Sequence, residues 1–269
     1  MTALTVFIDG VGLVGPGIAD WAQGQEQLAG RAPGQWLKTV LTAPAHLPPA
    51  ERRRAGAVIR VSQTVGFEAM AAAGLEAQGL VSVFTSSGGD GVNCHEICTA
   101  LASDDRLISP TRFHNSVHNA ASGYWGIATG AMATSTALCA FDGSFAAGLV
   151  EAVTQAVVQA EPVLLVAFDT DYPEPLRSAR PVPDTFGLAL VLSPVRTAHS
   201  LGQITLHPAH YLSSGVADVL DDAVLEAQRQ SIPAARGLPL LAALARQQAG
   251  VLRLDYLDGC CLELVFNPC

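Results

Sequence analysis

Residues 134–148 read TSTALCAFDGSFAAG and join two sequence patterns. The first part, Thr134 to Phe141, is apolar and nearly uncharged, and it predicts a strand. From Gly143 to Gln159 the chain is rich in alanine and valine, which indicates a helix. Backbone N–H groups converge where a strand enters a helix, so Cys139, close to this junction, is a candidate nucleophile.

Short apolar runs alternate with helical patterns on either side of this unit. Strands are expected at Leu4–Ile8, Leu80–Thr85, Val163–Phe168 and Phe186–Leu192, and a hairpin at Val251–Tyr256 and Cys261–Phe266. Helices are expected at residues 18–28, 50–74, 93–101, 115–130 and 238–248. Buried strands that alternate with small-residue helices predict an α/β fold with helices on both faces of a sheet.

The composition indicates a folded chain and excludes some classes of partner. Of the 269 residues, 49% are hydrophobic and 14% are charged, which is ample for a sizeable core. The net charge of −9, with Arg52 to Arg54 as the only basic run, argues against nucleic acid. No apolar run approaches the roughly 20 residues of a membrane span. Without a secreted cysteine framework or a leader pattern, we expect a cytoplasmic protein.

Gly10 to Gly15 follow the first expected strand and match the pattern G-x-G-x-x-G of dinucleotide-binding domains. Pro16 and Gly17 stand where the helix of such a domain should run, and no acidic residue follows at the distance that binds a ribose hydroxyl. A tight glycine-punctuated turn over residues 9–17 is therefore favoured. An NAD-dependent oxidoreductase remains an alternative.

Five residues with soft-metal donor atoms lie near one another in the sequence: Cys94, His95, Cys98, His114 and His118. Their spacing matches no familiar zinc signature. The polar segment 114–119 is suited to capping a helix and bracing a loop. We therefore expect neither a metal nor another cofactor.

The order of elements resembles the N-terminal half of the β-ketoacyl synthases, which have the thiolase-like fold. Residues 6–16 look like the first strand and turn of that family, and Pro49 to Arg54 looks like its proline-plus-basic helix start. The later residues that keep the family's order are Phe113, Asn119, Gly123, Ile127 and Gly130. The resemblance implies a layered α-β-α domain at residues 1–195, with a truncated C-terminal half. Residues 196–269 would form a short extension packed on the same domain.

The resemblance also bears on the nucleophile. In these enzymes a Thr-Ala-Cys segment ends the strand, whereas this chain has Leu138-Cys139-Ala140. Counting back from Gly143 and Gly148 places Ala140 at the nucleophile, and a register shifted by one residue would place Cys139 there. Neighbouring residues of a strand face opposite sides, so only one of the two can occupy the position.

The catalytic histidines of the family lie in a C-terminal half that is largely missing here. His199, His207 and His210 do not stand in the glycine-rich contexts of those histidines. Without such residues, decarboxylation and condensation lack their oxyanion partners. The resemblance therefore implies a chain with no activity of its own.

A ketosynthase-like chain without a nucleophile resembles a chain-length factor, and residues 114–125 look like the subunit of aryl-polyene biosynthesis. The resemblance implies a heterodimer with a full-length ketosynthase in polyketide or fatty-acid-type elongation, with acyl carrier protein contacted indirectly or weakly. The residues implied at the partner interface are Thr134, Ser135, Thr136, Ala137, Leu138 and Cys139. Those implied at the acyl tunnel, where they would set chain length, are Phe113, Tyr124, Trp125, Met132 and Phe141. For Tyr124 and Trp125, ordinary core packing is an equal alternative.

One alternative keeps the chain catalytic. Cys139 could serve a self-sufficient acyltransferase or hydrolase, with His114 or His118 as its base. An equal alternative is that Cys139 is a small hydrophobic residue buried in the strand.

Overall fold

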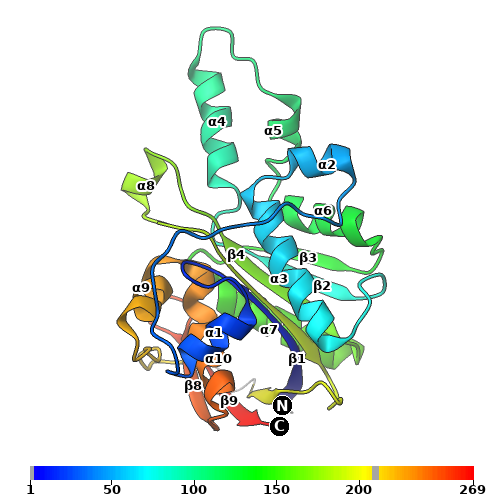
Figure 1. Ribbon diagram of the computed structural model, residues 1–269, viewed down its shortest axis with the longest axis vertical. Coiled ribbons are helices and arrows are strands. Elements are labelled where there is room, and N and C mark those ends of the chain that lie inside the picture. The colour runs from blue at the N-terminus through cyan, green and yellow to red at the C-terminus, as the bar shows by residue number, and fades with distance from the viewer. Residues whose placement is uncertain (1–2, 208–211) are drawn as a thin grey trace.

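The chain folds into three layers around one mixed sheet (Figure 1). The computed structural model describes residues 3–207 and 212–269. Helices cover both faces of the sheet, which confirms the α/β architecture expected from the sequence. Within the described residues, no helix combines the length and the apolar character needed to cross a membrane.

The described ranges form a nine-stranded sheet in the order β3-β2-β4-β5-β1-β6-β9-β7, and β8 pairs with β9. The strands are β1 (Leu4–Val14), β2 (Val81–Thr85), β3 (Ser135–Leu138), β4 (Val163–Asp169), β5 (Phe186–Ser193), β6 (Gly202–Leu206), β7 (Leu212–Ser213), β8 (Gly250–Asp255) and β9 (Cys261–Pro268). β2 pairs in parallel with both β3 and β4. The carboxyl ends of these three strands therefore meet at one end of the sheet, and the candidate site lies there.

The helices are distributed over both faces and one end of the sheet. They are α1 (Trp21–Leu28), α2 (Pro49–Arg54), α3 (Ala57–Ala73), α4 (Gly91–Ala102), α5 (Pro110–His114), α6 (Ala120–Thr129), α7 (Ser144–Gln159), α8 (Leu176–Ala179), α9 (Ala223–Ser231), the 3₁₀ helix η1 (Pro233–Gly237) and α10 (Leu238–Arg246). α3 and α6 cover one face, whereas α7, η1 and α10 cover the other. α4 and α5 project beyond the sheet (Figure 1).

β1 differs most from the sequence prediction. The turn expected at residues 9–17 is wrong over its first part, because the strand continues to Val14 with an irregularity at Asp9, and the tight turn lies between Gly15 and Ile18. Gly10 and Gly12 face the backbone of α3, where an added Cβ would lie 2.1 Å and 1.9 Å from carbonyl oxygens of that helix. The glycines thus permit close packing of helix on strand. The dinucleotide loop is excluded because this backbone is paired with β5.

Two expected helices begin or end elsewhere than predicted. The single helix expected at 50–74 is divided, because Ala55 and Gly56 are extended between α2 and α3. The apolar periodicity on which the prediction depends begins at Ala57, within α3, so extending the helix back to residue 50 rested only on the charged segment Glu51–Arg54. The helix expected from residue 115 begins only at Ala120, after the turn that follows α5.

The tail of the chain extends the same sheet. β6, which was not predicted, pairs with β1 on one side and β9 on the other. The expected hairpin is confirmed as β8 and β9, and α10 lies within the helix expected at 238–248. The division of the chain at residue 195 stays a prediction.

We expect Gly12→Ala to lower the free energy of unfolding by at least about 2 kcal/mol, because a backbone carbonyl cannot move aside as a side chain would. Gly250→Ala in β8 is the matched control, since a Cβ there meets no atom within 4 Å. Chemical denaturation of both variants measures the difference. Equal stability of the two variants would contradict the packing described for β1 and α3.

Candidate functional site

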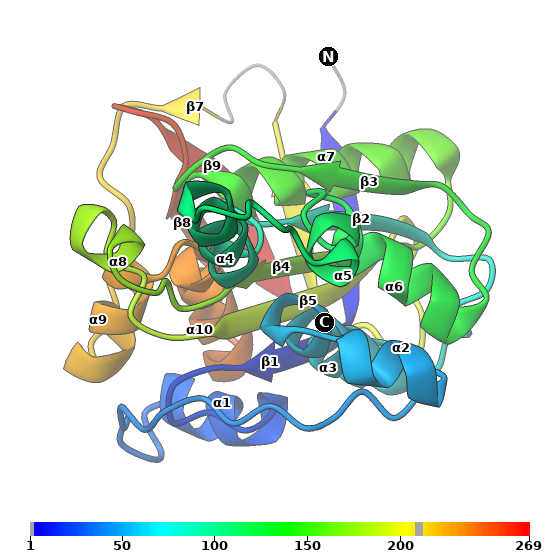
Figure 2. The ribbon, with the colours of Figure 1, turned by 90° about the horizontal axis from the view of Figure 1, so that it is seen from above.

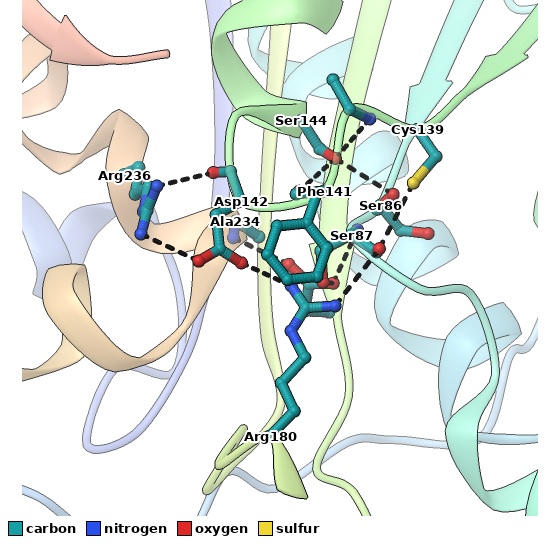
Figure 3. Close-up of polar contacts among 11 residues, drawn as sticks. Ser86, Ser87, Cys139, Phe141, Asp142, Ser144, Arg180, Ala234 and Arg236 are labelled. Carbon is teal, nitrogen blue, oxygen red and sulfur yellow. Dashed lines mark hydrogen bonds and ion pairs between the residues drawn. The ribbon is translucent and has the colours of Figure 1, made fainter. Parts of the chain in front are cut away.

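The turn from β3 into α7 is the centre of the candidate site (Figure 3). Phe141 has a φ of 50°, in the left-handed region that side chains other than glycine seldom adopt. The hydroxyl of Ser144 accepts a hydrogen bond from the N–H of Ala140 at 2.9 Å and donates to the carbonyl of Phe141 at 2.6 Å. The junction expected to hold a nucleophile is therefore a tight and strained turn.

Cys139 and Ala140 immediately precede the strained residue. Cys139 is exposed, and its thiol donates a hydrogen bond to the carbonyl of Ser87 at 3.3 Å. Ala140 is half-buried and offers only a methyl group. Which of the two occupies the nucleophile position stays a prediction.

The histidines considered as bases for Cys139 contact other groups. A ring nitrogen of His118 lies 3.5 Å from the hydroxyl of Ser86, and the ring of His114 lies edge-on to Tyr124. A nucleophilic thiol needs a base within hydrogen-bond distance. The contacts of the described residues include no Cys–His pair of this kind.

The later histidines are placed elsewhere in the fold. His199 is exposed, follows β5 and lies beside Gly74, at the end of the sheet opposite Asp169. His207 is exposed beside residues 263–265 of β9. His210 lies outside the described residues. Neither His199 nor His207 is among the described residues that line the cavity at the turn.

Asp142 pairs with two arginines (Figure 3). Its carboxylate lies 2.5 Å from Nη2 of Arg180 and 3.3 Å from Nη2 of Arg236. Arg236 also donates a hydrogen bond to the Asp142 carbonyl at 3.0 Å. Because Arg180 comes from the loop between β4 and β5 and Arg236 from η1, Asp142 joins two distant segments to the turn.

Asp169, the last residue of β4, is a fully buried carboxylate near this turn. It accepts hydrogen bonds from the N–H and hydroxyl of Ser87, at 2.9 Å and 2.6 Å, and from the N–H of Ala234 at 2.8 Å. Burial raises the pKa of Asp169 to about 6, although these donors and the nearby Arg180 favour the charged form. Asp169 therefore ties the loop after β2 and the start of η1 to the end of β4.

A cavity of about 620 Å³ opens beside the turn. Its walls are residues 140–143, the loop 214–217, Arg236 and the hairpin end at 255–261. The hairpin packs directly on the turn, since a Cβ on Gly143 would lie 2.3 Å from a carbonyl oxygen of the hairpin. Asp142 and Arg236 are paired with each other, which favours a structural role over acid–base chemistry for both.

The soft-metal donors are not gathered into a site. Cys94, His95 and Cys98 lie on α4, where both cysteines are exposed, and His114 and His118 lie on or after α5. In the part of the chain that the structure describes, no three histidine, cysteine, aspartate or glutamate side chains are grouped so that they could hold a metal ion.

The residues predicted for the acyl tunnel fall into two groups. Phe113, Met132 and Phe141 are exposed, whereas Tyr124 and Trp125 are buried in the core. Burial gives the last two a packing role. A tunnel role for any of the five stays a prediction.

β3 lies at an open edge of the sheet. It pairs with β2 on one side, and no strand of the described ranges pairs with its other side. Figure 2 shows α6 beside β2 and β3, and α4 lies beside α5 beyond the end of the sheet (Figure 1). On these elements, in the chain between them and in the turn after β3, the exposed large apolar residues are Val92, Leu101, Leu107, Phe113, Val117, Ile127, Met132 and Phe141. We call these eight residues the apolar surface.

Four polar residues of the site were not predicted: Asp142, Asp169, Arg180 and Arg236. Asp142 stands within the turn that the sequence singled out, which is a signal that could have selected it. Arg180 and Arg236 lie 38 and 94 residues further along the chain, and no spacing pattern links them to it.

Solved ketosynthases and their complexes share this fold. The chain is similar to a chain in the complex of the ketosynthase ApeO with its chain length factor ApeC from Xenorhabdus doucetiae. The two chains are 22% identical with a TM-score of 0.73, and the match covers 98% of this chain and 99% of that chain. A type II PKS acyl-carrier protein in complex with its ketosynthase bound to the hexaketide matches at 13% identity and a TM-score of 0.73, with 100% of both chains covered. The ishigamide ketosynthase/chain length factor matches at 14% identity and a TM-score of 0.65, with 98% and 99% covered. These likenesses confirm the layered thiolase-like fold.

Residues 19–252 match the sequence profile of the beta-ketoacyl synthase N-terminal domain. The chain belongs to this family. A search of curated protein sequences gives no match.

Asp169→Asn should change how the stability of the protein depends on pH. Because folding raises the pKa of Asp169 from 3.8 to about 6, the folded chain binds this proton more tightly than the unfolded chain does. The resulting stabilisation is complete below about pH 4 and is lost as the pH rises through about 6. Over that range, the wild type should lose about 3 kcal/mol of unfolding free energy relative to the variant.

Denaturation of the wild type and the variant between pH 4 and 7 measures this difference. Asp104→Asn, at an exposed position, is the control and should follow the wild type. Parallel pH profiles for the wild type and Asp169→Asn would show that Asp169 does not titrate in this range.

Proposed function

We propose that the chain is a non-catalytic subunit of a β-ketoacyl synthase heterodimer. It stabilises an active full-length ketosynthase and helps to set the length of the acyl product, as a chain-length factor does. The observation that carries the proposal is the open edge of β3 beside the apolar surface, in a chain of the β-ketoacyl synthase family. An open edge of this kind is a template for pairing with a second chain.

The apolar surface supports a permanent partner. α4 exposes Val92 and Leu101 on a helix that projects beyond the sheet, and its main helical neighbour is α5 (Figure 1). Binding of a second chain would remove these exposed apolar side chains from water. The proposed occupant is a full-length ketosynthase, because a second copy of this chain would leave the assembly without a catalytic centre. Two chains of one fold can meet edge to edge about a pseudo-two-fold axis.

The contents of the turn support the loss of catalysis. Ala140 has no nucleophilic atom, and the thiol of Cys139 is hydrogen-bonded to a backbone carbonyl. Among the described residues that line the adjoining cavity, neither His199 nor His207 is present. Decarboxylation and condensation need charge-stabilising groups at the reacting carbon, so these functions fall to the partner.

The similar structures are consistent with this assignment. Two of them are, by name, a ketosynthase with its chain length factor. A third holds an acyl-carrier protein with its ketosynthase. For this chain we place the reaction in polyketide, aryl-polyene or fatty-acid-type elongation in the cytoplasm, with carrier protein contacted indirectly or weakly.

The residues that would set chain length are the exposed ones among those predicted. Phe113, Met132 and Phe141 present bulky side chains on the surface that would meet the partner. A bulky group that enters the partner's acyl tunnel limits how far a product can grow, because packed interiors have little space to spare. Tyr124 and Trp125 are the weaker candidates, since both are already packed in this chain's own core.

Co-expression with a full-length ketosynthase from the same organism should yield a complex that purifies as one species. Leu101→Asp, which places a charge on the apolar surface, should reduce recovery of the complex at least about tenfold, because burying an unpaired carboxylate is strongly unfavourable. Affinity purification followed by size-exclusion chromatography measures both results.

Val158→Asp is the matched control, since Val158 is 75% exposed on α7 and lies outside the apolar surface. It should leave complex recovery unchanged. A wild-type chain that is monodisperse alone and never co-purifies with the ketosynthase would refute the proposed function.

Phe113→Ala and Met132→Ala should each shift the products of the complex toward longer acyl chains, because each removes a bulky group from the proposed tunnel. Mass spectrometry of the products released by the purified complex measures the shift, with Val158→Ala as the control. An unchanged length distribution in both variants would remove these residues from the chain-length role.

A further inference from the structure

Phe141 combines two features that are unfavourable together. Its backbone is in the left-handed region, which is unfavourable for a bulky residue. The residue is 61% exposed, so burial offsets little of that strain. A strained conformation persists only where surrounding contacts hold it in place, so the neighbours of the ring must supply those contacts.

Arg180 is the contact that holds the ring. Its guanidinium carbon lies 4.0 Å from the centre of the Phe141 ring and 5.9 Å from that of Tyr172. The same group pairs with Asp142 at 2.5 Å and donates a hydrogen bond to the Ser87 carbonyl at 3.4 Å. A planar guanidinium can stack on a ring and bind a carboxylate in its own plane at the same time, which the ammonium of lysine cannot do.

The position of Arg180 is itself determined from several sides. Its N–H donates to the carbonyl of Leu176, and its carbonyl accepts from the N–H of Val182, so the loop backbone is fixed around it. Its partner Asp142 is also held by Arg236. Figure 3 shows the arginines on either side of Asp142, with the Phe141 ring against Arg180.

We propose that Arg180 is a positioning residue that holds the Phe141 ring in its projecting orientation at the end of β3. The inference rests on the proposed function, in which this end of β3 faces the ketosynthase. The ring then reaches the partner's acyl tunnel as a fixed stop. Without Arg180 the ring can turn away, and the stop is lost while the interface remains.

A double-mutant cycle on the co-expressed complex tests this role. Phe141→Ala should shift the products toward longer chains by at least one elongation unit, and Arg180→Ala should shift them in the same direction. The double variant should equal Phe141→Ala, because Arg180 acts only through the ring. Arg180→Lys, which keeps the charge without the plane, should give an intermediate distribution. Arg31→Ala removes a guanidinium from an exposed ion pair with Glu26 and should match the wild type.

The outcomes separate this proposal from the one on which it rests. If no complex forms with the wild-type chain, the proposed function fails. If Arg180→Ala and Arg180→Lys assemble with unchanged product length, or if their effect adds to that of Phe141→Ala, positioning by Arg180 is refuted. If neither Arg180 variant assembles although the wild type does, Arg180 supports the fold rather than the ring, and the proposal is equally overturned.

Discussion

The backbone of α3 lies directly against the centre of the sheet, and the rest of the molecule is arranged around that contact. No space remains beneath the helix for a side chain at Gly10 or Gly12 on β1, or at Gly187 on β5. Residues such as Val65 therefore pack into the surface of the strands themselves. The close approach of α3 fixes the distance between this helix layer and the sheet. The same layer contains α6, whose Trp125 packs against Phe67 and Phe84.

The elements that were predicted well from the sequence are those whose local pattern is compatible with only one type of secondary structure. β4 and β5 are buried along their whole length and appear as unbroken apolar runs. In β1, by contrast, glycines signal a turn as readily as a close helix contact, and only the position of α3 decides between them. β6 is short and alternates buried with partly exposed residues, so its pairing with β1 and β9 depends on strands far away in sequence.

The candidate site divides in the same way. The family resemblance led to the turn, because the order of strand and helix around Ala140 is a local property of the chain. The contacts of Asp142 with Arg180 and Arg236 follow from the tertiary arrangement of three segments, and no local pattern encodes them. Aromatic side chains were equally ambiguous: Tyr124 is buried and Phe141 exposed, although both are large and lie close together in sequence.

The central place of β1 has a consequence for biosynthesis. This strand leaves the ribosome before the other strands of the sheet, yet Leu13 pairs with Leu188 and Leu4 with Leu206. Until those residues have been translated, β1 and the apolar side of α3 have no completed sheet to cover them. Contacts between such distant residues form slowly and leave apolar segments exposed in the nascent chain. The sheet centre therefore closes only after β5 and β6 have been made, and protection of the growing polypeptide by chaperones matters most for β1 and α3.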